Sequence, residues 1–392
     1  MNAGVAIDAT ALRRVRRRAL VVAVLGLILY AFGAAWWPGR AYHAWLFGYI
    51  FWLGVALGCL AIVMIQHITG GAWGLALRRI LESGARTIPA MALLFVPVLF
   101  GMKRLYPWAR PELVAANPLL QHKVPYLNPT FFTVRAAIYF ACWSLLAWLL
   151  SRWSRRQDET GDERFVDRFQ KLSGGGLLVF VLTMTFASVD WVMSMEPFWF
   201  STIYGGLLMT GFAVSAFCFA VAVAILLART GPLERLVTPK VLHDLGKLMF
   251  AFVMVWAYFA LSQFLIIWYG NLPEEIPWYQ RRLRGGWQWL GLVIILFHFA
   301  LPFLLLLSRG VKRDSVRLLR VAVLVFVMRL VDLYWVVAPG YFHDNTMHWL
   351  DMAAVFGLGG LWVVLFTTEL ARVAPLPQRD PYLAEALAHA NE

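Results

Sequence analysis

The chain has 392 residues, of which 61% are hydrophobic and only 15% are charged. Because soluble domains contain about 45–50% apolar residues, this composition excludes a soluble globular protein and predicts an all-α integral membrane protein. The net charge of +13 is explained by basic residues at membrane edges, so no nucleic-acid partner is expected.

The first apolar segment follows a basic arm. Residues 1–18 end in the motif RRVRRR, and residues 19–37 are apolar. The triplet Gly33-Ala34-Ala35 resembles a signal-peptide cleavage site. However, the apolar run is long and ends in aromatic residues at 36–37, as an uncleaved helix does. We therefore expect a cytoplasmic arm over 1–18 and a first transmembrane helix over 19–42.

Nine further apolar spans follow, each long enough to cross a bilayer as a helix. They lie near 43–68, 84–102, 130–150, 172–194, 200–228, 244–270, 287–308, 317–338 and 349–371. Ten spans place both termini on one side. With the N-terminus inside, most of the 35 Lys and Arg residues fall on inside segments, which predicts cytoplasmic termini.

The segments between the spans are short. The longest outside loop is expected at 103–129 and the longest inside loop, of mixed charge, at 151–171. Residues 75–80, with Arg78 and Arg79, predict a short interfacial helix. The tail 372–392 is expected to be cytoplasmic and either to contact a partner or to fray.

Two carboxylates mark the end of the fifth span. Asp190 shares a helical face with Thr183, Ala187 and Ser194, and Glu196 follows just beyond it. One interpretation of Asp190 is a carboxylate at the mouth of a proton or quinone path. The other is a carboxylate that caps or pairs with a neighbouring helix.

The seventh span carries a polar stripe. Asp244 and Lys247 lie at its inner end, where a lysine can extend to the interface. Tyr258, Ser262 and the adjacent Gln263 lie deeper, where either a hydrogen-bonded relay or a simple interhelical hydrogen bond is expected.

Two later spans contain deep ionisable groups. His298 precedes Pro302 by four residues, which favours a neutral imidazole bonded to a backbone carbonyl; a proton relay is the alternative. Arg329 and Asp332 are three residues apart and can pair on one face. An unpaired charge there would cost at least ~2.5–3.5 kcal/mol, and we favour a role of this pair in a polar channel.

No cofactor is expected in this chain. Its three cysteines, Cys59, Cys142 and Cys218, lie far apart inside apolar runs and fit no iron–sulfur or zinc spacing. His67 and His243 lie near the inner surface, so neither matches the depth of His298 as a second haem ligand.

Two motifs carry a resemblance to a known family. They are FASVDWVMSMEPFWFSTIYG at 186–205 and LHDLGKLMFAFVMVWAYFALSQFLIIWYGNLPEEIPWYQRRL at 242–283. Together they resemble the NrfD-like (polysulfide-reductase-like) membrane subunits of alternative complex III, a bacterial quinol:cytochrome c (or cupredoxin) oxidoreductase. One departure is Phe198, where relatives often carry His.

The resemblance implies an architecture and a cellular place. It implies a first four-helix bundle at 43–199, a second at 200–338, and a tenth transmembrane helix at 339–371. It also implies a multi-pass protein of the bacterial inner membrane. The residues that it makes proton-path candidates are Asp190, Glu196, Asp244, Lys247, Tyr258, Ser262 and Gln263, to which depth and polarity add His298, Arg329 and Asp332.

The same resemblance implies partners that carry the electrons. These are a paralogous NrfD-like subunit, a periplasmic iron–sulfur subunit, multihaem and monohaem cytochrome c subunits, other small membrane subunits and lipids. Quinone, with menaquinone as the expected type, is the one cofactor that this chain itself could bind. The implied role is to support quinol oxidation by the partners and to translocate protons.

Two other functions are compatible with the sequence. A quinol-interacting anchor of a molybdopterin oxidoreductase uses the same fold and differs only in its partners. An independent secondary transporter would have broken helices at matching positions in two halves, whereas Pro89, Pro97 and Pro302 show no clear symmetry.

Overall fold

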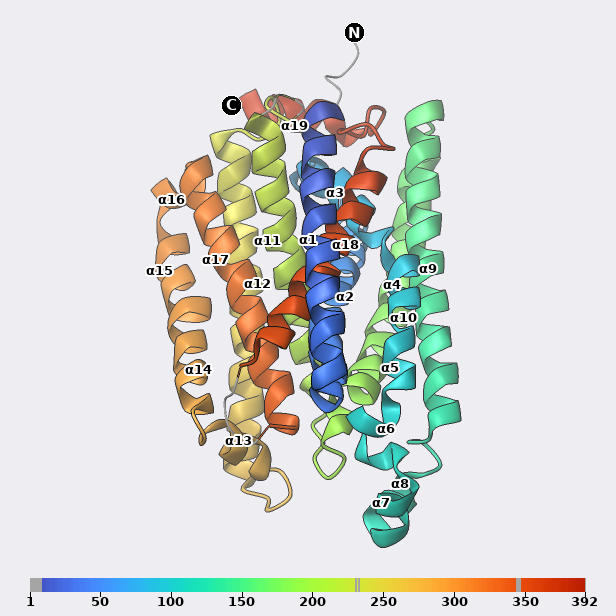
Figure 1. Cartoon of the computed structure of the whole chain (residues 1–392). Helices are drawn as coiled ribbons and strands as arrows, with labels where there is room; N and C mark the ends of the chain where they lie inside the picture. The colour runs from blue at the N-terminus through green and yellow to red at the C-terminus, as the bar shows by residue number, and fades with distance from the viewer. Residues whose placement is uncertain (1–8, 230, 232, 343–346, 392) are drawn as a thin grey trace.

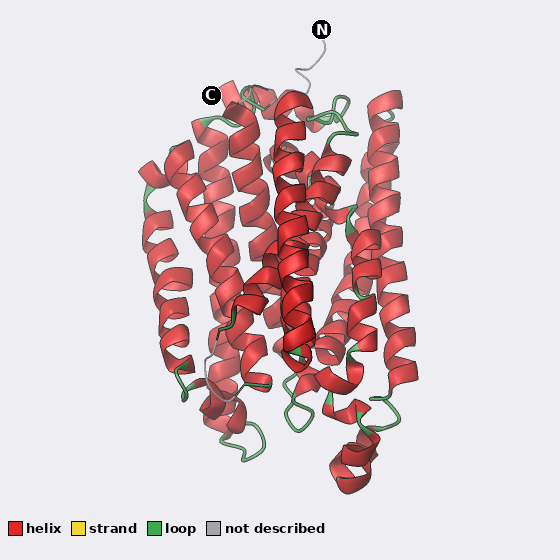
Figure 2. Cartoon of the chain, viewed as in Figure 1, coloured by secondary structure: helices red, strands yellow, loops and turns green. Residues whose placement is uncertain are grey.

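A computed structural model describes residues 9–229, 231, 233–342 and 347–391. Within these residues the chain is helical and contains no strand, as Figure 2 shows. Ten helical segments of the described chain are long and apolar enough to cross a membrane. The predicted class, an all-α integral membrane protein with about ten membrane helices, is therefore confirmed.

The ten spans run roughly side by side along one axis (Figure 1). They are α1 (Ala9–Trp36), α2 (Pro38–Thr69), α3 to α5 (Leu75–Ala85, Ile88–Leu94, Val96–Phe100), α9 (Pro129–Thr160), α10 (Arg164–Trp191), α11 (Tyr204–Arg229), α12 (Pro239–Gly270), α14–η4–α15 (Trp287–Val293, Ile294–Ala300, Leu301–Leu307), α17 (Ser315–Val337) and α18 (Trp349–Leu370). Both ends of the described chain lie at the same end of the bundle, which we call the terminal face; the other end is the distal face.

Short helices connect the spans. They are η1 (Ala72–Gly74), α6 (Met102–Leu105), η2 (Pro107–Ala109), α7 (Pro111–Ala116), α8 (Pro118–Lys123), η3 (Met193–Met195), α13 (Pro277–Arg282), α16 (Arg309–Arg313), η5 (Ala338–Gly340) and α19 (Tyr382–Asn391). The predicted outside loop at 103–129 is thus built largely of short helical turns. It ends where the Asn128 side chain accepts a hydrogen bond from the Phe131 amide and caps α9.

The α2 helix is the centre of the bundle. It is apolar on all sides and is almost fully buried, as expected for a helix that other helices surround. It contacts α10, α11 and α18, and the contacts with α11 and α18 are the more extensive. Since α2 joins the expected bundles at 43–199 and 200–338 so closely, their separation into two units stays a prediction.

The α1 helix packs on α18 through small residues. A Cβ atom added to Gly26 would lie 2.5 Å from the Gly357 nitrogen, and one added to Gly360 would lie 2.5 Å from the Ala23 nitrogen. The two backbones are therefore in direct contact, a packing that small residues permit between membrane helices.

The structure corrects the expected inside loop at 151–171. The α9 helix continues to Thr160 and α10 begins at Arg164, so only a tight turn separates them. Gly161 adopts a positive φ of 68°, the left-handed conformation that commonly ends a helix. The mixed charges of this region therefore lie on helical extensions.

The predicted interfacial helix at 75–80 is wrong. All eleven residues of α3 are buried, because other parts of the chain cover its polar face. Arg78 and Arg79 donate to Glu82 at 3.0 and 2.8 Å, and Arg79 also donates to Ser154 of α9 at 2.8 Å. Ion pairing inside the protein, rather than contact with the membrane surface, accounts for these charges.

The C-terminal segment (residues 376–388) completes this network. Asp380 pairs with Arg78, and the Gln378 amide donates to Asp158 at 3.0 Å. Beyond it, Ala386 of α19 is buried against Leu75. The tail within the described residues is therefore not frayed, because it packs onto the terminal face of its own chain, and a contact with a partner stays a prediction.

We predict that Gly360→Val destabilises the protein, because the added side chain would meet the α1 backbone. Overpacking of this kind costs about 1–3 kcal/mol. Thermal unfolding of the purified protein in detergent would show a lower midpoint. Gly174→Ala is the matched control, since nothing lies within 4 Å of a Cβ added there; equal midpoints for both variants would contradict the backbone contact.

Candidate functional site

A pair of buried charges lies on α17. Arg329 and Asp332 are both buried and form the ion pair that their spacing predicts. The Arg329 Nε also donates to the Gly211 carbonyl oxygen of α11 at 3.1 Å. The guanidinium thus connects two helices while its charge is balanced on its own helix.

Gly211 makes room for this guanidinium. A Cβ atom added to it would lie 1.9 Å from the Arg329 Nη2. Any side chain at this position would therefore displace Arg329, so the glycine in α11 is a requirement of the charge pair.

His298 is next to this pair and lacks a hydrogen-bond partner. Its side chain is fully buried, and neither ring nitrogen bonds to any described residue. The ring lies against Trp256 of α12 with centroids 4.1 Å apart, and it is within electrostatic range of Arg329. Leaving a buried polar group unpaired costs roughly 1–3 kcal/mol.

The expected bond from His298 to a backbone carbonyl is therefore wrong. The residue lies in η4, a seven-residue π-helical segment that ends just before Pro302. The ring points across to α12 rather than along its own helix, so it does not reach the carbonyl groups of its own turns. π-Helical turns are rare and occur frequently at functional sites.

Glu196 lies at the distal face between two arginines of α13. Its Oε1 is 3.1 Å from the Arg282 Nη2, and its Oε2 pairs with Arg281. Arg282 is fully buried and also donates to the Val336 carbonyl oxygen at 2.6 Å and to the Trp278 carbonyl oxygen at 2.9 Å. Burial lowers the pKa of Arg282, while the Glu196 carboxylate opposes this shift.

Tyr204 and Tyr279 lie within electrostatic range of both the deep pair and the distal pair. The Tyr204 hydroxyl is within electrostatic range of Arg282, Glu196 and Asp332. Tyr279, beside Gln263, is within range of Arg282 and Asp332, and burial raises its pKa to about 12. We call the following residues the buried polar series: His298, Arg329, Asp332, Tyr204, Arg282 and Glu196. Arg282, at one end of the series, belongs to α13, which lies at the distal face (Figure 1).

Asp190 belongs to a separate cluster. Its two oxygens accept from the Arg135 Nε and Nη2 at 2.8 and 2.9 Å, and the Tyr139 hydroxyl donates to it at 2.9 Å. Arg135 also donates to the Tyr126 carbonyl oxygen at 2.9 Å. The sequence left open whether Asp190 opens a proton or quinone path or pairs with a neighbouring helix. Its bonds to Arg135 of α9 agree with the pairing.

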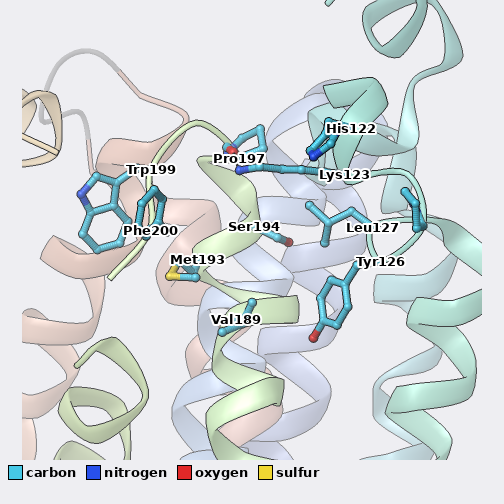
Figure 3. Close-up of a pocket in the computed structure, with 11 residues that line it drawn as sticks. His122, Lys123, Tyr126, Leu127, Val189, Met193, Ser194, Pro197, Trp199 and Phe200 are labelled. Carbon is cyan, nitrogen blue, oxygen red and sulfur yellow. Dashed lines mark hydrogen bonds between the residues drawn. The ribbon is translucent and has the colours of Figure 1, made fainter. Parts of the chain in front are cut away.

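A cavity of about 320 Å³ opens beside this cluster at the distal face (Figure 3). Its lining is mostly apolar and includes His122, Lys123, Pro125, Tyr126, Leu127, Val189, Met193, Ser194, Pro197, Trp199 and Phe200. The Lys123 ammonium donates to the Pro197 carbonyl oxygen. Asp190 does not line the cavity, so its carboxylate is closed off from that space.

The remaining predicted residues of α12 do not join the series. Asp244 and Lys247 pair with each other at 2.9 Å near the terminal face and are partly exposed. Tyr258 is 67% exposed on the outside of the bundle. No hydrogen bond joins Tyr258 to Ser262 among the described residues, so a relay through these two is not formed; their stripe faces outward. Gln263 alone is buried.

Several residues of these clusters were missed from the sequence. Arg135 lies six residues inside a predicted span, and a buried arginine requires a carboxylate, which could have indicated Asp190. Arg282 follows α12 in a loop that looks solvent-exposed in the sequence. Tyr204 and Gly211 carry no local signal of their role.

Comparison with known proteins adds no family. The chain matches no protein-family model, and it matches no curated protein.

Among the described residues, no group of three or more His, Cys, Asp or Glu side chains could hold a metal ion. The buried polar series combines an imidazole without a partner among the described residues, two carboxylates and a buried phenol, which are groups that can take up or release protons.

We predict that Asp190→Ala lowers the free energy of unfolding by about 3–5 kcal/mol, because it leaves the Arg135 charge buried without its partner. Asp167→Ala is the matched control, since the Asp167–Lys171 pair is largely exposed and such pairs contribute about 0–1 kcal/mol. Denaturant unfolding in detergent micelles would separate the two variants. Similar losses in both would show that Asp190 is not the stabilising partner of Arg135.

Proposed function

We propose that this chain is a membrane subunit of a bacterial respiratory quinol:cytochrome c (or cupredoxin) oxidoreductase. It would lie in the inner membrane with both termini in the cytoplasm. The motifs at 186–205 and 242–283, the ten-helix fold and the basic terminal segments support this proposal. Iron–sulfur clusters and c-type haem belong to the partner subunits in this proposal, and this chain supports their quinol oxidation.

The observation that carries a proton role is the state of His298. A neutral imidazole has one donor and one acceptor nitrogen, and here both nitrogens are unused among the described residues. It can therefore take a proton at one nitrogen and release one at the other. A buried histidine with no hydrogen bond lowers the stability of the fold. A proton-transfer group, in contrast, needs a ring nitrogen that no other group occupies.

The buried polar series then supplies a half-path. Asp332 is the carboxylate nearest to the deep end, and Arg329 keeps it in place. The Tyr204 hydroxyl, which both donates and accepts, is within electrostatic range of Asp332 and of the Glu196–Arg282 pair, and we propose it as the group between them. In the proposed orientation this series opens toward the periplasm. Burial in apolar surroundings limits the exchange of protons with water along its length.

We predict that Asp332→Asn reduces the number of protons moved per electron while quinol oxidation by the complex continues. The amide keeps the size of the carboxyl group but cannot carry the charge. Proton uptake and release of the complex reconstituted in vesicles would measure the ratio. Asp167→Asn, at an exposed position, should leave it unchanged. An unaltered ratio in Asp332→Asn would restrict the pair to a structural role.

The complex itself gives a second prediction. Purification through a tag on this chain should yield partner subunits, a haem c difference spectrum and iron–sulfur signals. Haem c together with a second NrfD-like chain is the expected result. A molybdopterin subunit in place of haem c would favour the anchor function, and a stable lone chain without chromophore would favour an independent transporter.

A further inference from the structure

Two arginines near the terminal face share one carboxylate, and a third arginine lies within electrostatic range of them. Arg86 follows α3, Arg155 lies on α9, and Arg372 follows α18. The Arg86 Nε is 2.7 Å from the Glu369 Oε2, and the Arg372 Nη1 donates to the Glu369 Oε1 at 2.6 Å. We call Arg86, Arg155 and Arg372 the arginine cluster. Glu369 is shared by two of its members.

The cluster has donors without acceptors. The Arg86 Nη1 is buried and bonds to no described residue. Arg155 makes no hydrogen bond or ion pair in the described part of the chain, yet it is close enough to Arg86 for their charges to repel. Both Glu82 oxygens, also within range of Arg86, are already bound by Arg78 and Arg79. Positive charge therefore exceeds negative charge here.

An apolar stripe begins beside the cluster and runs toward the distal face. Its residues are Pro89, Leu93, Val96 and Phe100, spaced three or four apart along α4 and α5. They lie on the outer surface; Leu93 is 73% exposed and Phe100 is 80% exposed. A single surface of the protein thus presents a cationic site at the membrane edge and an extended hydrocarbon contact leading from it into the membrane.

We propose that the arginine cluster binds the phosphate of an anionic phospholipid whose acyl chain lies along this stripe. Guanidinium groups form charge-assisted hydrogen bonds with phosphate oxygens, and basic pockets between membrane helices bind lipid head groups. Arg155, which is half-buried and has no ion pair in the described part of the chain, is the donor that such a phosphate would reach. The apolar stripe favours a lipid over free phosphate, because an acyl chain can pack against the stripe and inorganic phosphate cannot. This inference rests on the membrane fold and not on the proposed redox complex.

The test uses the full-length protein in vesicles with spin-labelled phosphatidylglycerol or phosphatidylcholine. The fraction of immobilised label should be larger for phosphatidylglycerol. In Arg155→Gln/Arg372→Gln, the preference should fall about fivefold for each charge removed. The charge-matched control Arg152→Gln/Arg156→Gln changes two exposed arginines of α9 and should keep the preference. If the double variant misfolds, the same measurement is made on Arg155→Gln alone, since this substitution breaks no bond between described residues.

The outcomes are distinct. Preference for phosphatidylglycerol that Arg155→Gln weakens and the control does not would support the site. Equal immobilisation of both lipids in the unmodified protein, or an equal loss in the control, would overturn it. Displacement of the labelled lipid by millimolar inorganic phosphate would show that the cluster recognises the phosphate alone, which would overturn the assignment to a lipid.

Discussion

A guanidinium buried among membrane helices needs a carboxylate, and this requirement organises the bundle. Arg135, Arg282 and Arg329 are each matched to an acidic side chain, and their remaining donors reach backbone carbonyl groups such as that of Gly211. A lone charge at such depth would cost at least ~2.5–3.5 kcal/mol. Because these arginines bond to groups on other helices or loops, satisfying the charges also sets how neighbouring segments are aligned.

His298 departs from this pattern, because both of its ring nitrogens are buried and bond to no described residue. Evolution tolerates an unpaired buried polar group mainly where it serves a purpose, and here the ring lies in a π-helical segment beside the Arg329–Asp332 pair. The pair, the phenol of Tyr204 and Glu196 extend from it toward the distal face. The ionisable groups of this half of the bundle are therefore within electrostatic range of one another from His298 to Glu196.

The features that could be predicted from the sequence are those set by residues close together in the chain. The ten spans came from apolar length, and the Arg329–Asp332 pair came from a spacing of three. The partners of Asp190 and Arg78 lie 55 and 302 residues away, and no periodicity within a helix indicates such distances. The interfacial assignment of 75–80 failed for the same reason, because two arginines in a short helix look exposed until distant carboxylates are brought to them. The prediction of a relay through Tyr258 failed because Tyr258 lies on the outward-facing side of α12.

The pairing of Arg78 with Asp380 has a consequence for how the chain is made. Synthesis proceeds from the N-terminus, so α3 is complete about 300 residues before its last carboxylate exists. Until then Arg78 has only Glu82 of its two carboxylates, whereas Arg79 pairs with Glu82 and, once α9 is made, with Asp158. Seating the C-terminal segment is therefore a late step of assembly, and a chain that ends before residue 380 would leave the buried Arg78 without one of its two carboxylates.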